Sequence, residues 1–287
     1  MEKIEKYTIE YIKPKVTLLQ ESGLGVAEIA ARTCYDSFES SENESVKNAM
    51  SRLDTDAINS IEKSDLLSNL AWVHHHHSII EHATLSFLVE GTSRGVLQEH
   101  ARHRLQAISV RSTRYTMSSV INAFVASLES GVGTQEAFKF FLEKLLALEL
   151  FVISDEDYLA IEIRAIFDKF LFQYKRDESF LTNAVAKSSL PYLDEFKGDS
   201  EALYEALEAG KRKRNVGDGF KHIVSDNWRV DMVVTFNIRS LKNYFDLRDS
   251  GAAWFQIQWL AQKMKEVTPI KYLRLISKEH KSKDKKD

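Results

Sequence analysis

Two stretches of this chain change from a strand pattern to a helix pattern within a few residues. Residues 231–248, DMVVTFNIRSLKNYFDLR, begin with β-branched residues and become helical near Asn237. Residues 83–91, ATLSFLVEG, alternate as a strand does, and helix formers follow at 93–104 with Ser93 as the expected N-cap. Only 3 prolines and 11 glycines occur in 287 residues. The chain therefore favours long helices with some strands over a turn-rich all-β fold.

Helical periodicity marks three further segments. We expect helices at 25–38, with Val26 and Ile29 on one face, at 64–76 and at 252–267. The polar stretch 39–62 reads as a loop with a short helix, and ISVRSTRYT, 108–116, as a strand or extended loop. The chain is expected to form a single domain over 1–287. Within it, 119–215 is a helical insertion without a chemistry-bearing cluster, and 278–287 is a disordered charged tail.

Charge and cysteine content limit the functional classes. The formal charge is −3 and the pI is about 6.3, so the whole chain does not attract nucleic acid, and any anion site must be a local concentration of cations. Cys34 is the single cysteine, so the sequence offers no disulfide framework, which fits a reducing cytoplasm. No apolar run suits a membrane span or a signal peptide. We therefore expect a cytoplasmic protein with no membrane and no nucleic-acid partner.

A local concentration of cations lies between Arg94 and Arg114. It contains five other basic or histidine residues and one acid, Glu99: the five are His100, Arg102, His103, Arg104 and Arg111. On the expected helix, the consecutive residues Arg102, His103 and Arg104 would point in directions about 100° apart, which a solvated stripe does not require. Arginine forks suit bidentate contact with phosphate. The segment therefore indicates a polyanionic ligand held at a helix end.

A second polar group lies in NIRSLKNYFDLR. Arg239 and Asn243 are four residues apart and share one helix face, with Leu247 one turn further on. Arg248 lies roughly half a turn away in angle, so it is expected to serve a different ligand or a different part of one.

The histidine run suggests a rival function. A zinc-dependent hydrolase would use the His74–His82 cluster, with His100 and His103, three apart on the expected helix, completing the site. The spacing His77 to Glu81-His82 is one residue too long for the His-x-x-Glu-His pattern. A second alternative is a nucleic-acid-binding module that uses Arg94–Arg114.

Four ordered blocks resemble the flavin-dependent thymidylate synthases (ThyX). RHRLQAISVRSTRY is similar to the family signature, in which Arg-His-Arg is followed by seven residues, Ser, and a closing Arg-Tyr. NIRSLKNYFDLR resembles the second block, AARTC at 30–34 the early Ala-Ala-Arg segment, and HHSIIEH the histidine-rich segment before the first strand. Ser109 and Val110 depart from the Asn-Glu of many relatives. The resemblance implies an α+β fold with a mixed or antiparallel sheet flanked by long helices.

The resemblance also implies a reaction and its ligands. Relatives convert dUMP to dTMP, with methylenetetrahydrofolate as carbon donor, NADPH as reductant and FAD as cofactor. They are homotetramers whose active sites form between subunits. The positions similar to the family's flavin-binding residues are His76, Ser78, Glu81, Arg102, His103, Arg104, Asn237, Arg239 and Asn243. Those similar to dUMP-binding positions are Gln98, Glu99, Ser112, Arg114, Lys221 and Arg248. No metal ligand is implied.

Two of these residues are expected to be catalytic. Arg248 would lie against the uracil carbonyl and stabilise negative charge on the ring. Ser112 is expected to hydrogen-bond dUMP, because no base stands at a fixed spacing to activate it as a nucleophile. Cys34 lies on an expected helix without a neighbouring base and is expected to be a small buried residue. The flavin, not a cysteine, would then carry the hydride and methylene chemistry.

Overall fold

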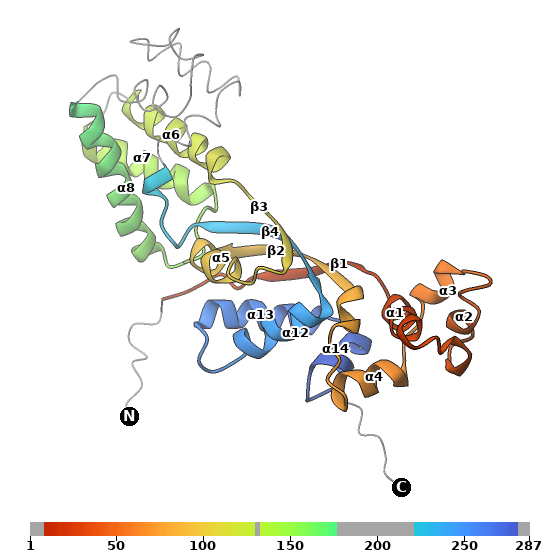
Figure 1. Ribbon diagram of the computed structural model, residues 1–287. Coiled ribbons are helices and arrows are strands. Elements are labelled where there is room, and N and C mark those ends of the chain that lie inside the picture. The colour runs from red at the N-terminus through yellow and green to blue at the C-terminus, as the bar shows by residue number, and fades with distance from the viewer. Residues whose placement is uncertain (1–8, 130–132, 177–220, 281–287) are drawn as a thin grey trace, which may run out of the picture. The chain divides into compact units, whose positions relative to one another are not determined.

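The computed structural model describes residues 9–129, 133–176 and 221–280, and these divide into two compact units (Figure 1). The first unit contains 9–12, 93–95, 111–129, 133–176 and 221–229, and the second contains 13–92, 96–110 and 230–280. Each unit has its own core of buried apolar side chains.

A four-stranded sheet is the main feature of the second unit. Its strand order is β1 (Lys15–Glu21), β2 (Thr84–Ser93), β4 (Arg229–Asn237), β3 (Gln106–Val110), and both outer pairs are antiparallel. In β2 the alternation places Leu85, Phe87 and Val89 in the core, fully buried, as the sequence predicted. The predicted α+β class is confirmed.

Helices of the second unit pack against this sheet and one another. Helix α13 (Phe255–Val267) packs on β1 and on α12 (Ile238–Arg248) (Figure 1). Ser64 caps α4 (Asp65–Trp72) by accepting a hydrogen bond from the Leu67 N–H. The remaining elements of this unit are α1 (Gly25–Tyr35), η2 (Phe38–Ser40), α2 (Glu44–Lys47), α3 (Thr55–Asn59), η3 (Ile79–His82) and α14 (Ile270–Ile276). Helix α5 (Arg94–His100) begins at the end of β2.

The described residues of the first unit form three long helices and a short 3-10 helix. These are α6 (Thr113–Glu129), α7 (Thr134–Ala147), α8 (Glu156–Arg176) and η5 (Lys221–Ile223). Phe124, Phe141 and Phe167 are fully buried and make tilted or edge-on ring contacts with each other, which suits aromatic packing. Within 119–215, residues 119–129, 134–147 and 156–176 are helical, and the segment between α7 and α8 forms isolated bridges at Phe151 and Ile153. Residues 130–132 and 177–215 lie outside the described residues.

The structure corrects several element boundaries. The helix expected at 25–38 ends at Tyr35, where Asp36 adopts a left-handed conformation, and the helix expected at 64–76 ends at Trp72. Val26 is exposed, and the buried face of α1 instead carries Ala27, Ala31 and two charged residues, Glu28 and Arg32. Hydrophobic periodicity did not predict this face, because the buried Glu28 carboxylate finds hydrogen-bond partners inside the protein. Its carboxylate accepts hydrogen bonds from Ser41 Oγ at 2.6 Å and Asn43 Nδ2 at 2.8 Å.

The helix expected at 93–104 also ends early, at His100, and Ser93 is the last residue of β2 rather than an N-cap. The stretch STRYT belongs largely to α6, which begins at Thr113. Of the tail predicted to be disordered, 281–287 lie outside the described residues. Among the described helices, none is long and apolar enough to cross a membrane.

Candidate functional site

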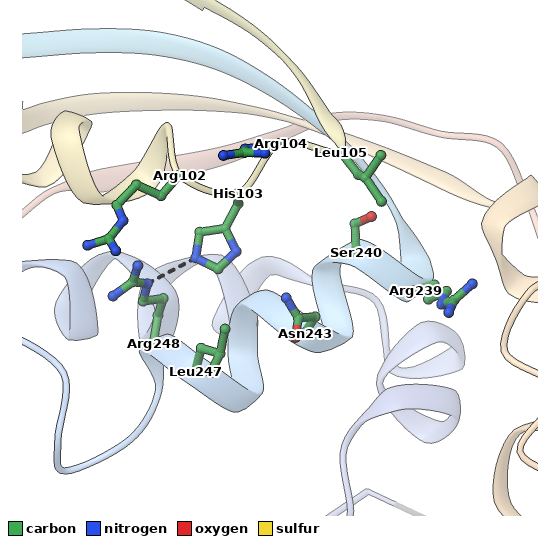
Figure 2. A pocket seen from close by; sticks show the side chains of 9 residues that line it. All are labelled: Arg102, His103, Arg104, Leu105, Arg239, Ser240, Asn243, Leu247 and Arg248. Atoms are coloured by element: carbon green, nitrogen blue, oxygen red, sulfur yellow. Dashed lines mark hydrogen bonds between the residues drawn. The ribbon is translucent and has the colours of Figure 1, made fainter.

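A cavity of about 800 Å³ lies in the second unit, between the loop that follows α5 and one face of α12 (Figure 2). Among the described residues, four arginines and no acidic residue line it. The lining residues are Arg102, His103, Arg104, Leu105, Arg239, Ser240, Asn243, Leu247 and Arg248. Such a cation-rich lining, with one amide and one imidazole, matches the donors that bind phosphate groups.

Helix α12 supplies one wall of this cavity. Arg239, Asn243 and Leu247 follow one another at four-residue spacing and line the cavity together, as their helical spacing predicted. Arg248 lines the same cavity, although it lies about half a helical turn away in angle from Arg239 and Asn243.

The loop after α5 supplies the opposite wall. Arg102, His103 and Arg104 were expected on a helix, but they lie in the turn and extended segment beyond it. Two side chains bind carbonyl groups of the last turn, which have no partner within the helix once it ends. Arg248 donates to the Glu99 carbonyl at 3.3 Å, and the Gln106 side-chain amide donates to the His100 carbonyl at 3.0 Å. All three basic residues nevertheless reach the cavity, as a chain wrapped around an anion at a helix end requires.

Arg248 is the most constrained cation of the site. Its Nε–H donates to His103 Nε2 at 2.9 Å (Figure 2). One terminal nitrogen donates to Glu99 Oε2, also at 2.9 Å. Its side chain is only 17% exposed. Charge-assisted hydrogen bonds to a half-buried carboxylate hold this guanidinium in one orientation.

An aromatic pair backs this arrangement. The ring of Tyr244 lies edge-on to His103 and to His100, with ring centroids 4.8 and 5.1 Å apart. The Tyr244 hydroxyl and His100 Nδ1 share a hydrogen bond of 3.1 Å. Burial lowers the pKa of His100 to about 4, and burial, Arg248 and Arg102 lower the pKa of His103. Burial likewise raises the pKa of Tyr244 above its ordinary range. These three rings are therefore uncharged at neutral pH.

The remaining predicted flavin positions lie at the start of α12 and in the segment before β2. Glu81 forms an ion pair with Arg239, which joins η3 to α12. The Asn237 side chain caps α12. His76 and Ser78 are exposed in the turn between α4 and η3. These four residues are absent from the cavity lining.

The predicted substrate residues are divided between the two units. Gln98 and Glu99 lie on α5 in the second unit. Ser112 belongs to the first unit and lies just ahead of α6, where its carbonyl accepts a hydrogen bond from Thr116 Oγ1 at 3.3 Å. Arg114 lies in the first turn of α6, and Lys221 is exposed at the start of η5 in the same unit.

The histidine run and Cys34 bear on the rival chemistries. Among residues 9–129, 133–176 and 221–280, no three His, Cys, Asp or Glu side chains are grouped to hold a metal ion, so the zinc-hydrolase alternative gains no support. His100 and His103 are not on one helix, and both flank the ring of Tyr244. Cys34 lies on α1 as predicted but is exposed, which corrects the expectation of a buried thiol.

Sequence reasoning missed part of the site. Leu105 and Ser240 line the cavity without having been singled out, although each is adjacent to a predicted residue. Tyr244 went unnoticed because a tyrosine in an amphipathic helix usually indicates packing. Its contact with His100, 144 positions away in sequence, leaves no local signal.

Comparison with known proteins gives this cavity a family context. The model of the Thy1 family, described as thymidylate synthase complementing protein, matches residues 17–270. The chain therefore belongs to the Thy1 family, that of the flavin-dependent thymidylate synthases (ThyX).

Individual relatives agree with this family. The flavin-dependent thymidylate synthase of Wolinella succinogenes is 27% identical over 258 residues, which cover 88% of this chain and 93% of that protein. The corresponding protein of Helicobacter pylori strain J99 is 28% identical over 193 residues, 66% of this chain and 86% of that one. A crystal structure of ThyX from Helicobacter pylori with FAD and dUMP superposes with a TM-score of 0.55 at 23% identity, covering 92% of this chain and 97% of the other. At that identity, the superposition shows a shared fold.

Proposed function

We propose that this chain is a flavin-dependent thymidylate synthase that converts dUMP to dTMP, with FAD as cofactor, methylenetetrahydrofolate as carbon donor and NADPH as reductant. The observation that carries the proposal is the cavity of about 800 Å³ lined by Arg102, Arg104, Arg239 and Arg248. The curated relatives bear this activity in their names, and the Helicobacter pylori structure contains FAD and dUMP.

The donors of the cavity fit the diphosphate and the ring edge of FAD. Arg102, Arg104 and Arg239 supply cationic forks for phosphate oxygens, and the Asn243 amide supplies both a donor and an acceptor. His103 belongs to the same wall. Glu81, paired with Arg239, orients that arginine. His76, Ser78 and Asn237 complete the proposed set of flavin-binding residues. When bound, FAD supplies the hydride and methylene chemistry.

Arg248 is the residue proposed to act on the uracil ring. Its guanidinium is held by Glu99 and His103 before any ligand arrives, so its positive charge needs no reorganisation when negative charge develops on a uracil carbonyl oxygen. Gln98, Ser112, Arg114 and Lys221 are proposed to bind dUMP as well.

Ser112 is proposed to hydrogen-bond dUMP rather than to attack it. A Ser112→Ala variant should then bind dUMP more weakly. Loss of turnover in this variant with unchanged dUMP affinity would show that Ser112 has a chemical role instead.

We also propose a homotetramer with active sites at subunit interfaces. The edge strand β3 supports an interface, because Ile108 and Val110 are exposed on it and Val233 is exposed on the neighbouring β4. Light scattering on the purified protein measures the mass directly, and a monomer at working concentration would contradict this proposal.

The decisive experiment combines colour and turnover. The purified protein should show a flavin absorption spectrum and should oxidise NADPH in the presence of methylenetetrahydrofolate only when dUMP is added. A colourless protein that binds stoichiometric zinc would contradict the proposal.

One pair of variants links this activity to the cavity. Arg239→Gln should lower FAD content. Lys242→Gln is the matched control, because Lys242 lies on the same helix, pairs with Asp246 at 2.6 Å, and does not line the cavity. Equal flavin content in both variants would show that Arg239, and with it this wall of the cavity, does not bind FAD.

A further inference from the structure

The hydrogen bonds of Arg248 leave it only two N–H groups for a ligand. A guanidinium has five N–H groups. Three of them are used by the chain itself: Nε–H donates to His103 Nε2 at 2.9 Å, and the terminal nitrogens donate to Oε2 and the carbonyl of Glu99 at 2.9 and 3.3 Å. Among the described residues, the other two have no partner. The direction in which they point therefore depends on Glu99 and His103.

The bond to His103 fixes the protonation state of that imidazole. An arginine Nε carries a hydrogen at every accessible pH, so it always donates. His103 Nε2 must then be the acceptor and carry no hydrogen. His103 is consequently neutral, with its single proton on Nδ1.

The groups around His103 keep its imidazole neutral and fix its position. Tyr244 lies edge-on to its imidazole, and the hydroxyl of that tyrosine is bound in turn to the fully buried His100. The charged groups that act on His103 are Arg248 and Arg102, both cations, which lower its pKa together with burial. Glu99, the nearby acid, is already engaged by Arg248.

We propose that His103 is a positioning residue that holds Arg248 for the substrate through its neutral Nε2, supported from behind by the Tyr244–His100 pair. This inference rests on the proposed function, in which Arg248 binds the uracil ring. When acid protonates His103, Nε2 becomes a donor facing a donor, the bond to Arg248 breaks, and the guanidinium loses one of its anchors. The site should then bind dUMP more weakly.

Two substitutions of His103 separate positioning from general structural damage. His103→Gln keeps a neutral acceptor near the place of Nε2, and His103→Leu removes it. His74→Gln is the matched control, since it changes an exposed histidine outside the cavity lining. Thermal unfolding of each purified full-length holoenzyme identifies a variant that fails to fold, and its FAD content separately identifies one that folds but loses flavin.

The readout is the dissociation constant for dUMP, measured by calorimetry between pH 5.5 and 8. At pH 8 the leucine variant should bind dUMP about tenfold more weakly, the loss expected for one charge-assisted hydrogen bond, while the glutamine variant stays near wild type. Acidification should weaken binding more in the wild type than in the glutamine variant. The dUMP phosphate titrates in both proteins, so the difference between their curves reports His103. Equal losses in the two variants, or identical pH curves for wild type and glutamine variant, would overturn the proposal.

A second measurement does not depend on the proposed reaction. Nitrogen-15 spectra of histidine-labelled protein, assigned by comparison with the His103→Gln variant, should show a neutral His103 with its proton on Nδ1 at pH 7.5. A protonated imidazole, or one with its proton on Nε2, contradicts the proposal. If wild-type protein fails to bind dUMP at all, the proposed function fails, and these spectra still decide the state of His103.

Discussion

The side-chain Oδ1 of Asn237 accepts a hydrogen bond of 2.8 Å from the backbone N–H of Ser240. Asn237 is the last residue of β4 and the N-cap of α12, so this bond closes the first turn of the helix that carries Arg239, Asn243 and Arg248. Asn237, which family resemblance matches to flavin binding, therefore also stabilises the start of α12.

Replacing the cap should cost stability independently of any cofactor. Asn237→Ala should lower the free energy of unfolding of the flavin-free protein by about 1 kcal/mol, the usual cost of losing an N-cap. Asn237→Asp retains an acceptor and adds a charge that the helix N-terminus favours, so its stability should stay close to wild type. Denaturant titration of the flavin-free proteins measures both. An aspartate variant as unstable as the alanine variant would show that Asn237 does not act as a cap.

The buried carboxylate of Glu28 should be a large contributor to stability. Glu28 is fully buried, accepts hydrogen bonds from Ser41 and Asn43, and lies 3.5 Å from the Arg32 guanidinium. Glu28→Ala would leave Arg32 buried without its counter-charge, and the loss should be about 3 kcal/mol. Glu39→Ala, which removes an exposed glutamate nearby, is the control and should be neutral. Similar midpoints of urea unfolding for the Glu28 and Glu39 variants would contradict the larger stabilising role of Glu28.

Stability should fall on acidification because of His100. Its pKa is about 4 in the folded protein against an ordinary 6.5, so between these values the unfolded chain binds more protons than the folded one. The effect of His100 on the free energy of unfolding is therefore absent above pH 6.5. As the pH falls to 4, it lowers the free energy of unfolding by about 3 kcal/mol.

Substitutions test this assignment through the slope of unfolding free energy against pH. His100→Gln should flatten the slope between pH 4.5 and 6.5, because glutamine does not titrate. His82→Gln, which removes an exposed histidine, should leave the slope unchanged. A slope that persists in the His100 variant would assign the acid sensitivity to other groups.

Cys34 should be dispensable for turnover. It is exposed on α1, and the proposed chemistry assigns no bond to its sulfur. Cys34→Ser should form dTMP at the wild-type rate, and thiol-alkylating reagents should leave the wild type active. Inactivation by alkylation that the serine variant escapes would place a cysteine in the reaction.

Local patterns predicted the elements whose determinants are local. The alternation of Leu85, Phe87 and Val89 and the change of period at Asn237 both depend on neighbours in sequence, and both are confirmed. The end of α5 was predicted wrongly because helix formers continue past it. Near that end the Glu99 carbonyl is bound by the guanidinium of Arg248, 149 residues away, and such a distant contact leaves no signal in the local sequence.

The same distinction applies to the candidate site. Arg239 and Asn243 were placed together correctly from helix geometry alone. The charged buried face of α1 was not predicted, because hydrophobic periodicity assigns Glu28 and Arg32 to solvent. Only the polar groups of the segment that follows explain their burial.

The pairing of β2 with β4 has a consequence for how the protein is made. Ser86 and Thr235 share a hydrogen bond across these strands, and Asp231 binds the Gly91 N–H, over sequence separations of 149 and 140 residues. During synthesis, β1 and β2 leave the ribosome long before the strand that completes their sheet, while the helices of the first unit emerge in between. The early strands must therefore wait with an open edge, and a truncation anywhere before 230 leaves the sheet without its central partner.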